Sequence, residues 1–317
     1  MKCIYLIVLS ACFSLSAQDF PPAAGLPGST AIPSNSIYID EWVDEVEVIR
    51  GPMDISQPSL GLASIGDADA AEGPSDPGVV SLGDGGQAII TLSSSISNHE
   101  GFDFAVFENG FSADFLELAF VEVSSDGENY FRFPSFSNTS TEEQIGPFNI
   151  LDATYIHNLA GKYESQFGTP FDLMDLDTVL GLDISSITHI KIIDVVGSVQ
   201  EVYASYDSQG NIINDPWPTA FESSGFDLES VAILLENELG LIDNEVTLSY
   251  TFQDNFLSIP ANDTNLIFQV FDLHGRLVKA GVSTGGISLN ELTNGIYIVH
   301  ILNEVHNFAA LKLLKKG

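Results

Sequence analysis

The sequence predicts an all-β protein whose main domain is a β-sandwich of the jelly-roll type. Short apolar runs of strand length recur along the chain, and turn residues separate them. No long apolar stripe with the 3.6-residue period of a helix accompanies these runs. The hydrophobic fraction of 44% is too high for a disordered chain, and 317 residues suit one large domain and one small one.

The strand patterns of the large domain are bounded by turn signals such as Asp84-Gly85 and Asp126-Gly127. Strands are expected at 79–82, 87–92, 103–108, 117–124, 129–133, 187–196 and 230–235. Four segments follow from these patterns. They are a signal peptide at 1–17, an extended lead-in rich in proline, glycine and serine at 18–42, a β-sandwich binding domain at 43–236, and a small C-terminal module at 243–317.

The N-terminus has the pattern of a secretory signal peptide. Lys2 precedes an apolar run, and small residues lead to a cleavage site after Ala17. A lipoprotein signal is the alternative, because the residues up to Cys12 resemble a lipobox. Cleavage after Ala17 would remove both cysteines, Cys3 and Cys12, and with them every disulfide, cysteine metal ligand and thiol nucleophile. No later segment reaches the ~18 apolar residues of a membrane span.

The chain is strongly acidic, with 44 acidic residues against 10 basic ones and a formal charge of −34. Between Gln18 and Glu236 the basic residues are Arg50, Arg132, Lys162 and Lys191. Such a surface repels phosphate backbones, which argues against nucleic-acid binding. The acidity either serves solubility in salty water or indicates that the protein takes up cations from solution.

Three predicted strands each carry a carboxylate at the end of an apolar face. The two-residue alternation of a strand places Glu108 on the same face as Phe104 and Val106. The same rule places Glu122 and Asp194 on apolar faces of their own strands. A buried carboxylate must be paired, protonated or bound to a metal, because burying a lone charge is costly.

The few basic residues cannot neutralise this set, so the sequence predicts a bound calcium ion, which prefers carboxylate and carbonyl oxygens. The predicted metal ligands are Asp103, Glu108, Glu122, Asp194 and Asp227. In one alternative, these carboxylates only mark strand ends in water. In another, a pair such as Glu108 and Glu122 serves a glycoside hydrolase, which needs two carboxyls at a defined separation.

Aromatic residues in loops suggest where a ligand binds. Trp217 lies between two prolines that should stiffen its loop, and such an indole suits stacking on a sugar ring or a flat cofactor. Phe111 and Phe115 flank a second loop, and Trp217 and Phe111 are the predicted ligand contacts. In the alternative, Trp217 caps the end of the sandwich core.

Two catalytic patterns fail in their context. Gly281-Val-Ser-Thr-Gly285 fits a serine-hydrolase elbow but lies between predicted strands with no helix after it. Gly83-Asp-Gly-Gly86 resembles part of a dinucleotide fingerprint, but a strand follows where a helix is required, so a hairpin turn is expected there. The sequence therefore favours a protein without catalytic activity.

Several motifs of the large domain resemble an uncharacterised family of bacterial cell-surface proteins. They are GFDFAVFENGF at 101–111, ELAFVEVSSDG at 117–127, LAGK at 159–162, GTPFDL at 168–173 and SGFDL at 224–228. Some members of that family are associated with outer-membrane cobalamin uptake, which implies a corrinoid as one ligand. The EVSSDG segment also resembles the strand and turn of galactose-binding-like and discoidin-like sandwiches.

The C-terminal module resembles the type A sorting domain of the type IX secretion system of Bacteroidetes. The resemblance lies in LIFQVFDLHGRLV at 266–278, ISLNEL at 287–292, GIYIV at 295–299 and ALKLLKK at 310–316. It implies a small β-sandwich, the type IX secretion machinery as a partner, and transport across the outer membrane to the cell surface or beyond. The Pro-Asn-Pro usual near the start of that domain is absent, with Ser258-Ile-Pro-Ala-Asn262 nearest to it.

Together these observations predict a secreted, surface-displayed, non-catalytic binding protein that is stabilised by calcium and binds a glycan. Three alternatives stay open: a corrinoid- or nutrient-capture protein working with an outer-membrane transporter, a glycoside hydrolase, and a structural or adhesive protein.

Overall fold

The computed structural model describes residues 20–26, 28–74, 78–235, 251–253, 255–258, 266–272, 277–283, 286–302 and 308–315. The predicted signal peptide and both cysteines lie outside these residues. The chain divides after residue 237 into two compact units, which are described separately. Within the described ranges the chain forms strands and short 3₁₀ turns, and it has no helix long and apolar enough to cross a membrane.

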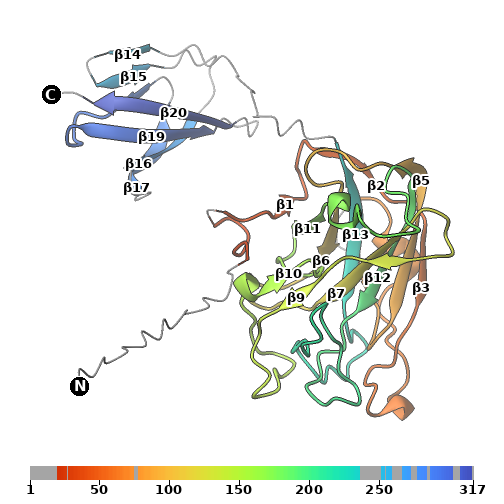
Figure 1. The fold of residues 1–317 in the computed structure, drawn as a ribbon. Coiled ribbons are helices and arrows are strands. Elements are labelled where there is room, and N and C mark those ends of the chain that lie inside the picture. Colours follow the sequence, from red (N-terminus) through yellow and green to blue (C-terminus); the bar gives the residue numbers. More distant parts are fainter. Residues whose placement is uncertain are drawn as a thin grey trace, which may run out of the picture. The chain divides into compact units, whose positions relative to one another are not determined.

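The N-terminal unit contains two large antiparallel sheets (Figure 1). The first sheet has the order β1 (Ile32–Pro33), β11 (Phe167–Phe171), β6 (Phe104–Glu108), β13 (Asp227–Leu234) and β2 (Ile39–Trp42), with β4 (Val80–Ser81) also paired to β13. The second has the order β3 (Val46–Ile49), β5 (Gln87–Ile96), β12 (Ile187–Asp194), β7 (Ala119–Ser124) and β8 (Phe131–Arg132). Short strands β9 (Phe136–Ser137) and β10 (Ile156–His157) pair with each other. The 3₁₀ turns are η1 (Pro58–Leu60), η2 (Ala68–Ala71), η3 (Ala153–Tyr155) and η4 (Leu173–Leu176).

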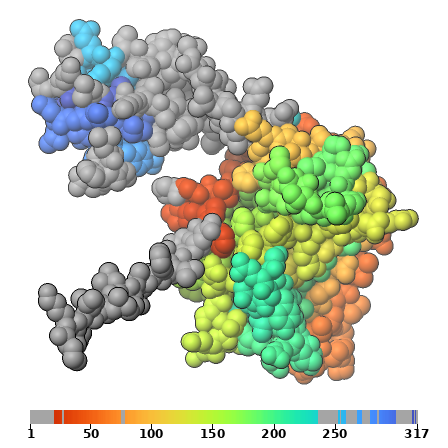
Figure 2. Space-filling model, viewed as in Figure 1, coloured from red at the N-terminus to blue at the C-terminus, as the bar shows by residue number. Residues whose placement is uncertain are grey.

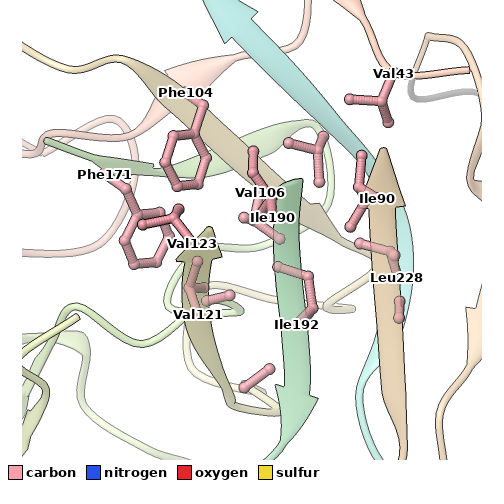
Figure 3. Packing of buried hydrophobic residues seen from close by; sticks show 14 of the residues in the cluster. Val43, Ile90, Phe104, Val106, Val121, Val123, Phe171, Ile190, Ile192 and Leu228 are labelled. Atoms are coloured by element: carbon pink, nitrogen blue, oxygen red, sulfur yellow. The ribbon is translucent and has the colours of Figure 1, made fainter. Parts of the chain in front are cut away.

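The two sheets pack face to face on one apolar core, which confirms the predicted sandwich. Alternate residues of each strand point into it, including Phe104 and Val106 from β6 and Ile190 and Ile192 from β12 (Figure 3). The ring of Phe104 stacks on that of Phe171, with 5.3 Å between centroids. Burial of this apolar surface is the main source of stability for the unit.

The N-terminal edge of the sandwich lies earlier than the sequence predicted. Residues 18–42 were expected to be an extended lead-in, but β1 pairs with β11 and β2 pairs with β13. Trp42 of β2 packs on Phe107, with 5.0 Å between ring centroids, on the face of the first sheet that points away from the main core. Apolar residues such as Ile39 and Trp42 therefore cover a second apolar face that the main core leaves open.

The C-terminal unit has its own two sheets and its own core. Strands β14 (Thr251–Gln253), β15 (Phe256–Ser258) and β18 (Gly286–Ser288) form one sheet. Strands β17 (Leu277–Ser283), β16 (Leu266–Asp272), β19 (Gly295–Leu302) and β20 (Phe308–Lys315) form the other. Ser283, the serine of the elbow-like pattern, is the last residue of a strand, as expected for a chance match.

Antiparallel pairing brings several strand ends of the N-terminal unit to one end of its sandwich. Strand β6 ends at Glu108 where β13 begins at Asp227, and β12 ends at Asp194 where β7 begins. Main-chain hydrogen bonds join the connecting segments there, such as Ser64 N to Glu222 O, Asp84 N to Pro52 O and Trp217 N to Ile145 O. We call this region the loop end. It comprises residues 51–66, 83–86, 109–118, 140–150, 194–199 and 213–226, and segments from several of these ranges lie side by side at the bottom of the unit in Figure 2.

Candidate functional site

Besides Asp84, five carboxylates with raised pKa values lie at the loop end or at the strand ends that border it. Glu108, Asp194, Asp215 and Asp227 are buried, whereas Glu117 is half-buried. Glu117 is the central member of this group. Burial raises its pKa well above the ordinary value, and the negative charges of Asp227, Asp215 and Asp194 raise it further.

Asp194 links the end of β12 to two loops through hydrogen bonds. Its Oδ2 accepts a hydrogen bond from Gly85 N at 2.8 Å, and its Oδ1 accepts one from Phe226 N at 2.7 Å. Gly225 has φ of +73°, and a Cβ there would lie 2.7 Å from Asp194 Oδ1, so only glycine suits this position. Burial, with Asp84 as the nearest like charge, raises the pKa of Asp194 to about 8.

Glu108 and Asp215 are each held by one main-chain bond. Gly110 N donates to Glu108 Oε2 at 2.8 Å, and Leu118 N donates to Asp215 Oδ2 at 3.1 Å. The second oxygen of each carboxylate, Glu108 Oε1 and Asp215 Oδ1, is buried without a hydrogen-bond partner. Burial raises the pKa of both groups well above the ordinary range, and the Glu117 and Asp227 charges add to the rise at Glu108.

Asp227 is the member of the group that lies near a basic side chain. It accepts a hydrogen bond from the Ser81 hydroxyl. Burial raises its pKa to about 6, while the positive charge of Arg50 acts in the opposite direction. Arg50 itself donates to the main-chain oxygens of Ile65 (2.8 Å), Ser81 (2.6 Å) and Gly66.

Of the five predicted metal ligands, the structure brings Glu108, Asp194 and Asp227 together. Asp103 lies at the opposite end of β6, where it accepts hydrogen bonds from His99 N (3.0 Å) and Leu173 N (2.6 Å). The prediction that Asp103 shares a site with Glu108 is therefore wrong, because the two residues stand at opposite ends of one strand.

Glu122 also lies apart from the group, so its predicted place in the same site is wrong. It stands on the outer face of the second sheet and pairs with Arg132 at 2.9 Å and with Lys191, its cross-strand neighbour, at 3.6 Å. Strand parity grouped it correctly with Phe120, but Phe120 belongs to a separate apolar cluster on that outer face. Glu108 lies on the inner face of the first sheet and Glu122 on the outer face of the second sheet, so the two do not form a catalytic pair.

The loop-end carboxylates are not a ready-made metal site as they stand. In the residues that the structure describes, no three histidine, cysteine, aspartate or glutamate side chains form a group that could hold a metal ion. Four of the five acids are buried, and hydrogen bonds from neighbouring groups fix the orientation of these four side chains.

Sequence reasoning missed Glu117, Asp215 and Asp84. Glu117 precedes β7 between the buried residues Leu116 and Leu118, and this apolar context was its only local signal. Asp84 belongs to the turn at 83–86, which was expected to be a hairpin. The turn exists, with Gly86 N bonded to Gly83 O, but the preceding strand β4 pairs with β13 and not with β5. The turn therefore links the two sheets.

Trp217 is inside the loop end and is not displayed to solvent. Its side chain is 5% exposed, and its indole N–H donates to Asp84 Oδ2 at 3.0 Å. The ring also packs against Tyr203, with 6.0 Å between centroids. This arrangement agrees with the alternative in which Trp217 caps the core. Phe111 is 82% exposed and packs on Phe115 with 5.6 Å between centroids.

A shallow, open groove lies at the loop end. It has a volume of about 690 Å³ and is lined by Met53, Ile65, Phe148, Ala220, Phe221, Glu222 and Ser223. The side chains of Phe148 and Phe221 are 75% and 47% exposed, and their ring centroids lie 5.9 Å apart. An adjoining hollow of about 410 Å³ shares Phe148 and adds Gln144 and Asn149. We call these two hollows together the phenylalanine groove.

Residues 252–316 match the family described as the secretion system C-terminal sorting domain. The C-terminal unit is a type IX sorting domain. The protein is accordingly secreted to the cell surface or the extracellular space, and this domain interacts with the type IX secretion machinery.

No curated protein matches this chain. Solved structures similar to it include the Ruminococcus gnavus β-glucuronidase in complex with uronic isofagomine, at 11% identity and a TM-score of 0.26, covering 90% of this chain and 45% of that one. The same enzyme in complex with D-glucaro-d-lactam matches at 12% identity and a TM-score of 0.26, covering 90% and 47%. The chain thus spans about half the length of these structures. Similarity this low carries no argument about ligand or chemistry.

Proposed function

We propose that the N-terminal unit is a non-catalytic glycan-binding module, exported to the cell surface by its sorting domain, and that the phenylalanine groove is its ligand site. The observation that carries this proposal is the pair of exposed rings, Phe148 and Phe221, on the wall of an open groove. Neighbouring exposed apolar side chains often mark a binding site, and aromatic rings suit the apolar faces of sugar rings.

Polar side chains next to the rings support a glycan. Gln144 and Asn149 line the adjoining hollow, and Glu222 lines the main groove. A binding site for a small ligand combines apolar walls with a few polar groups that fix its orientation. Amides and carboxylates provide the acceptors and donors that sugar hydroxyls require.

The placement of the acids supports binding without catalysis. A glycoside hydrolase needs two carboxyls facing each other across the cleft that holds the sugar. The strongly perturbed acids of the loop end, such as Glu108, Asp194 and Asp215, are buried and accept main-chain hydrogen bonds. None of these three lines the phenylalanine groove, whose own carboxylates, Glu143 and Glu222, are on exposed residues.

Capture of a corrinoid is the second candidate. Met53 and Ile65 add apolar surface to the groove beside Phe148 and Phe221. Such a wide apolar wall also suits the edge of a large flat macrocycle. A ligand of this kind would link the protein to an outer-membrane transporter.

The experiment is a binding titration of the full secreted chain against a glycan panel and cobalamin, with Phe148→Ala and Phe221→Ala beside the wild type. Each groove variant is expected to bind roughly tenfold more weakly, because stacking and apolar contact on one ring contribute about 1.4 kcal/mol. Thermal stability should change little, since Phe148 is largely exposed and Phe221 is about half exposed.

Phe111→Ala is the matched control, since it removes an exposed phenyl ring outside the groove and should leave the affinity unchanged. A glycan that both groove variants bind as tightly as the wild type would contradict the proposed site. Binding of cobalamin alone would favour corrinoid capture over glycan binding. Hydrolysis of a glycan would show that the protein is an enzyme, which would contradict both candidates.

A further inference from the structure

The acids at the loop end have almost no basic partner. In the described part of the N-terminal unit, Arg132 and Lys191 pair with Glu122, and Lys162 donates to the main-chain oxygen of Ile156 at 2.7 Å. The positive charge of Arg50 lowers the pKa of Asp227, but Arg50 donates its hydrogen bonds to main-chain oxygens. Glu108, Glu117 and Asp215 therefore share a buried region without a protein cation.

Two unpartnered oxygens belong to this region. Glu108 is 1% exposed and Asp215 is 4% exposed, and each has one oxygen fixed by a main-chain N–H and one oxygen with no partner. The Asp215 carboxylate accepts from the N–H of Leu118, the residue that follows Glu117, and the negative charge of Glu117 contributes to the raised pKa of Glu108. A buried polar atom without a partner is rare in native proteins and indicates a missing water or ion.

Without an ion these acids avoid mutual repulsion only by keeping their protons, as the raised pKa values of Glu108, Glu117 and Asp215 indicate, and water alone does not change this. A divalent cation removes the repulsion and fills the empty coordination of both oxygens. Calcium is the cation that such a site favours, since it takes six to eight oxygen ligands from carboxylates, main-chain carbonyls and water in flexible geometry. Magnesium demands a smaller, regular octahedron and keeps more of its water.

We propose that Glu108, Glu117 and Asp215 bind a calcium ion at the loop end, beside Asp194 and Asp227. Among the described residues these three side chains do not form a metal-binding group, so Glu117 must move toward the other two when the ion binds. Glu117 supplies this movement, because it is half-buried and makes no hydrogen bond within the described chain. Water and main-chain oxygens complete the coordination.

The ion would connect three segments that the fold brings together. Glu108 ends β6, Glu117 precedes β7, and Asp215 lies on the segment that continues to Trp217 and then to Phe221 of the phenylalanine groove. Calcium would therefore hold the groove-bearing loop in place. The ion site itself does not depend on the proposed glycan function.

The test is calorimetric titration of calcium into the chelator-treated full chain, together with its thermal unfolding. Wild type is expected to bind calcium, and its unfolding midpoint should rise by roughly 5–10 °C when calcium is at about a hundred times its dissociation constant. Magnesium at the same concentration should give a smaller rise. Glu108→Gln and Glu117→Gln should each weaken calcium binding at least tenfold.

In chelator, the same two variants should unfold at the wild-type midpoint or above it, because a neutral amide replaces an acid that must otherwise be protonated or repel its neighbours. Glu122→Gln is the matched control, an identical change at a glutamate that already has basic partners, and it should bind calcium as the wild type does. Phe221→Ala should also bind calcium normally, which separates this proposal from the glycan site.

The proposal is overturned if wild type shows neither calcium binding nor a midpoint shift. It is also overturned if Glu117→Gln binds calcium as tightly as the wild type. Should Glu108→Gln fail to fold, Glu117→Gln still decides the matter, since its side chain is half-buried and the change keeps its shape.

Discussion

The space between the two sheets changes from apolar to acidic along its length, and one strand from each sheet shows this change. In the middle, Val106 of β6 and Ile192 of β12 point into the apolar core. Two residues further along the same faces stand Glu108 and Asp194, both buried. Burial stabilises the first pair directly, whereas the second pair must be compensated for its lost hydration.

The outer face of the second sheet completes the comparison. Glu122, a glutamate like Glu108, lies there beside Arg132 and Lys191 and forms ion pairs with both. At the loop end the compensation comes from main-chain N–H groups and, in our proposal, from calcium. The position of an acid relative to the available cations therefore decides its role, and its position in the strand does not.

The apolar middle should be the most sensitive region. Phe104→Ala removes a fully buried ring that packs on Phe171 and Phe133, and it should lower the free energy of unfolding by about 3–5 kcal/mol. Urea denaturation measures this loss, which should be equal in calcium and in chelator because Phe104 lies at the opposite end of β6 from Glu108. A loss below about 1 kcal/mol would show that the middle is not the main source of stability.

The far end of β6 offers an acid outside the loop-end group. Burial raises the pKa of Asp103 to about 6, against about 3.9 in an unfolded chain, and its titratable neighbours are His99 and Asp172. The folded state then binds more protons than the unfolded state, so this group's contribution to stability is present below pH ~4 and is lost as the pH rises through about 6.

Asp103→Asn should remove that part of the pH dependence. Between pH 4.5 and 7.5, the stability of the variant relative to wild type should shift in the variant's favour by about 1 kcal/mol, because solvent screens part of the effect. Chemical denaturation at the two pH values, with calcium present in both, measures the shift. Parallel pH profiles for the two proteins would show that Asp103 has an ordinary pKa.

The outer face should show the smallest effect. Glu122→Gln breaks partly exposed ion pairs with Arg132 and Lys191, so it should lower the free energy of unfolding by less than about 1 kcal/mol. The loss should shrink further in 1 M salt, which screens exposed charges. A loss of about 3 kcal/mol would instead place Glu122 among the essential acids and remove the contrast with Glu108.

Local pattern was enough to predict much of the sandwich. The two-residue period identified β5, β6, β7, β12 and β13, and it placed Glu108 and Asp194 with the core-facing residues of their strands. The same rule could not tell which face of β7 is the inner one, because Phe120 is buried on the outer face by a second apolar cluster. Glu122 was misplaced for that reason.

The rest depends on contacts between distant segments. Asp215 and Glu117 are almost a hundred residues apart, and only the folded loops bring them together. Strands β1 and β2 lie in a segment whose proline and glycine content suggested a lead-in, and their partners lie more than a hundred residues further along the chain. Trp217 looked like a displayed ring because its partner Asp84 lies 133 positions away.

The most direct test of the central claim is the unfolding midpoint of the full chain in calcium and in chelator, for wild type and Glu108→Gln. Our account predicts that calcium raises the wild-type midpoint by roughly 5–10 °C and leaves that of Glu108→Gln nearly unchanged. A wild-type midpoint that is the same in calcium and in chelator would contradict it, and the loop-end acids would then be held by shared protons and main-chain hydrogen bonds alone.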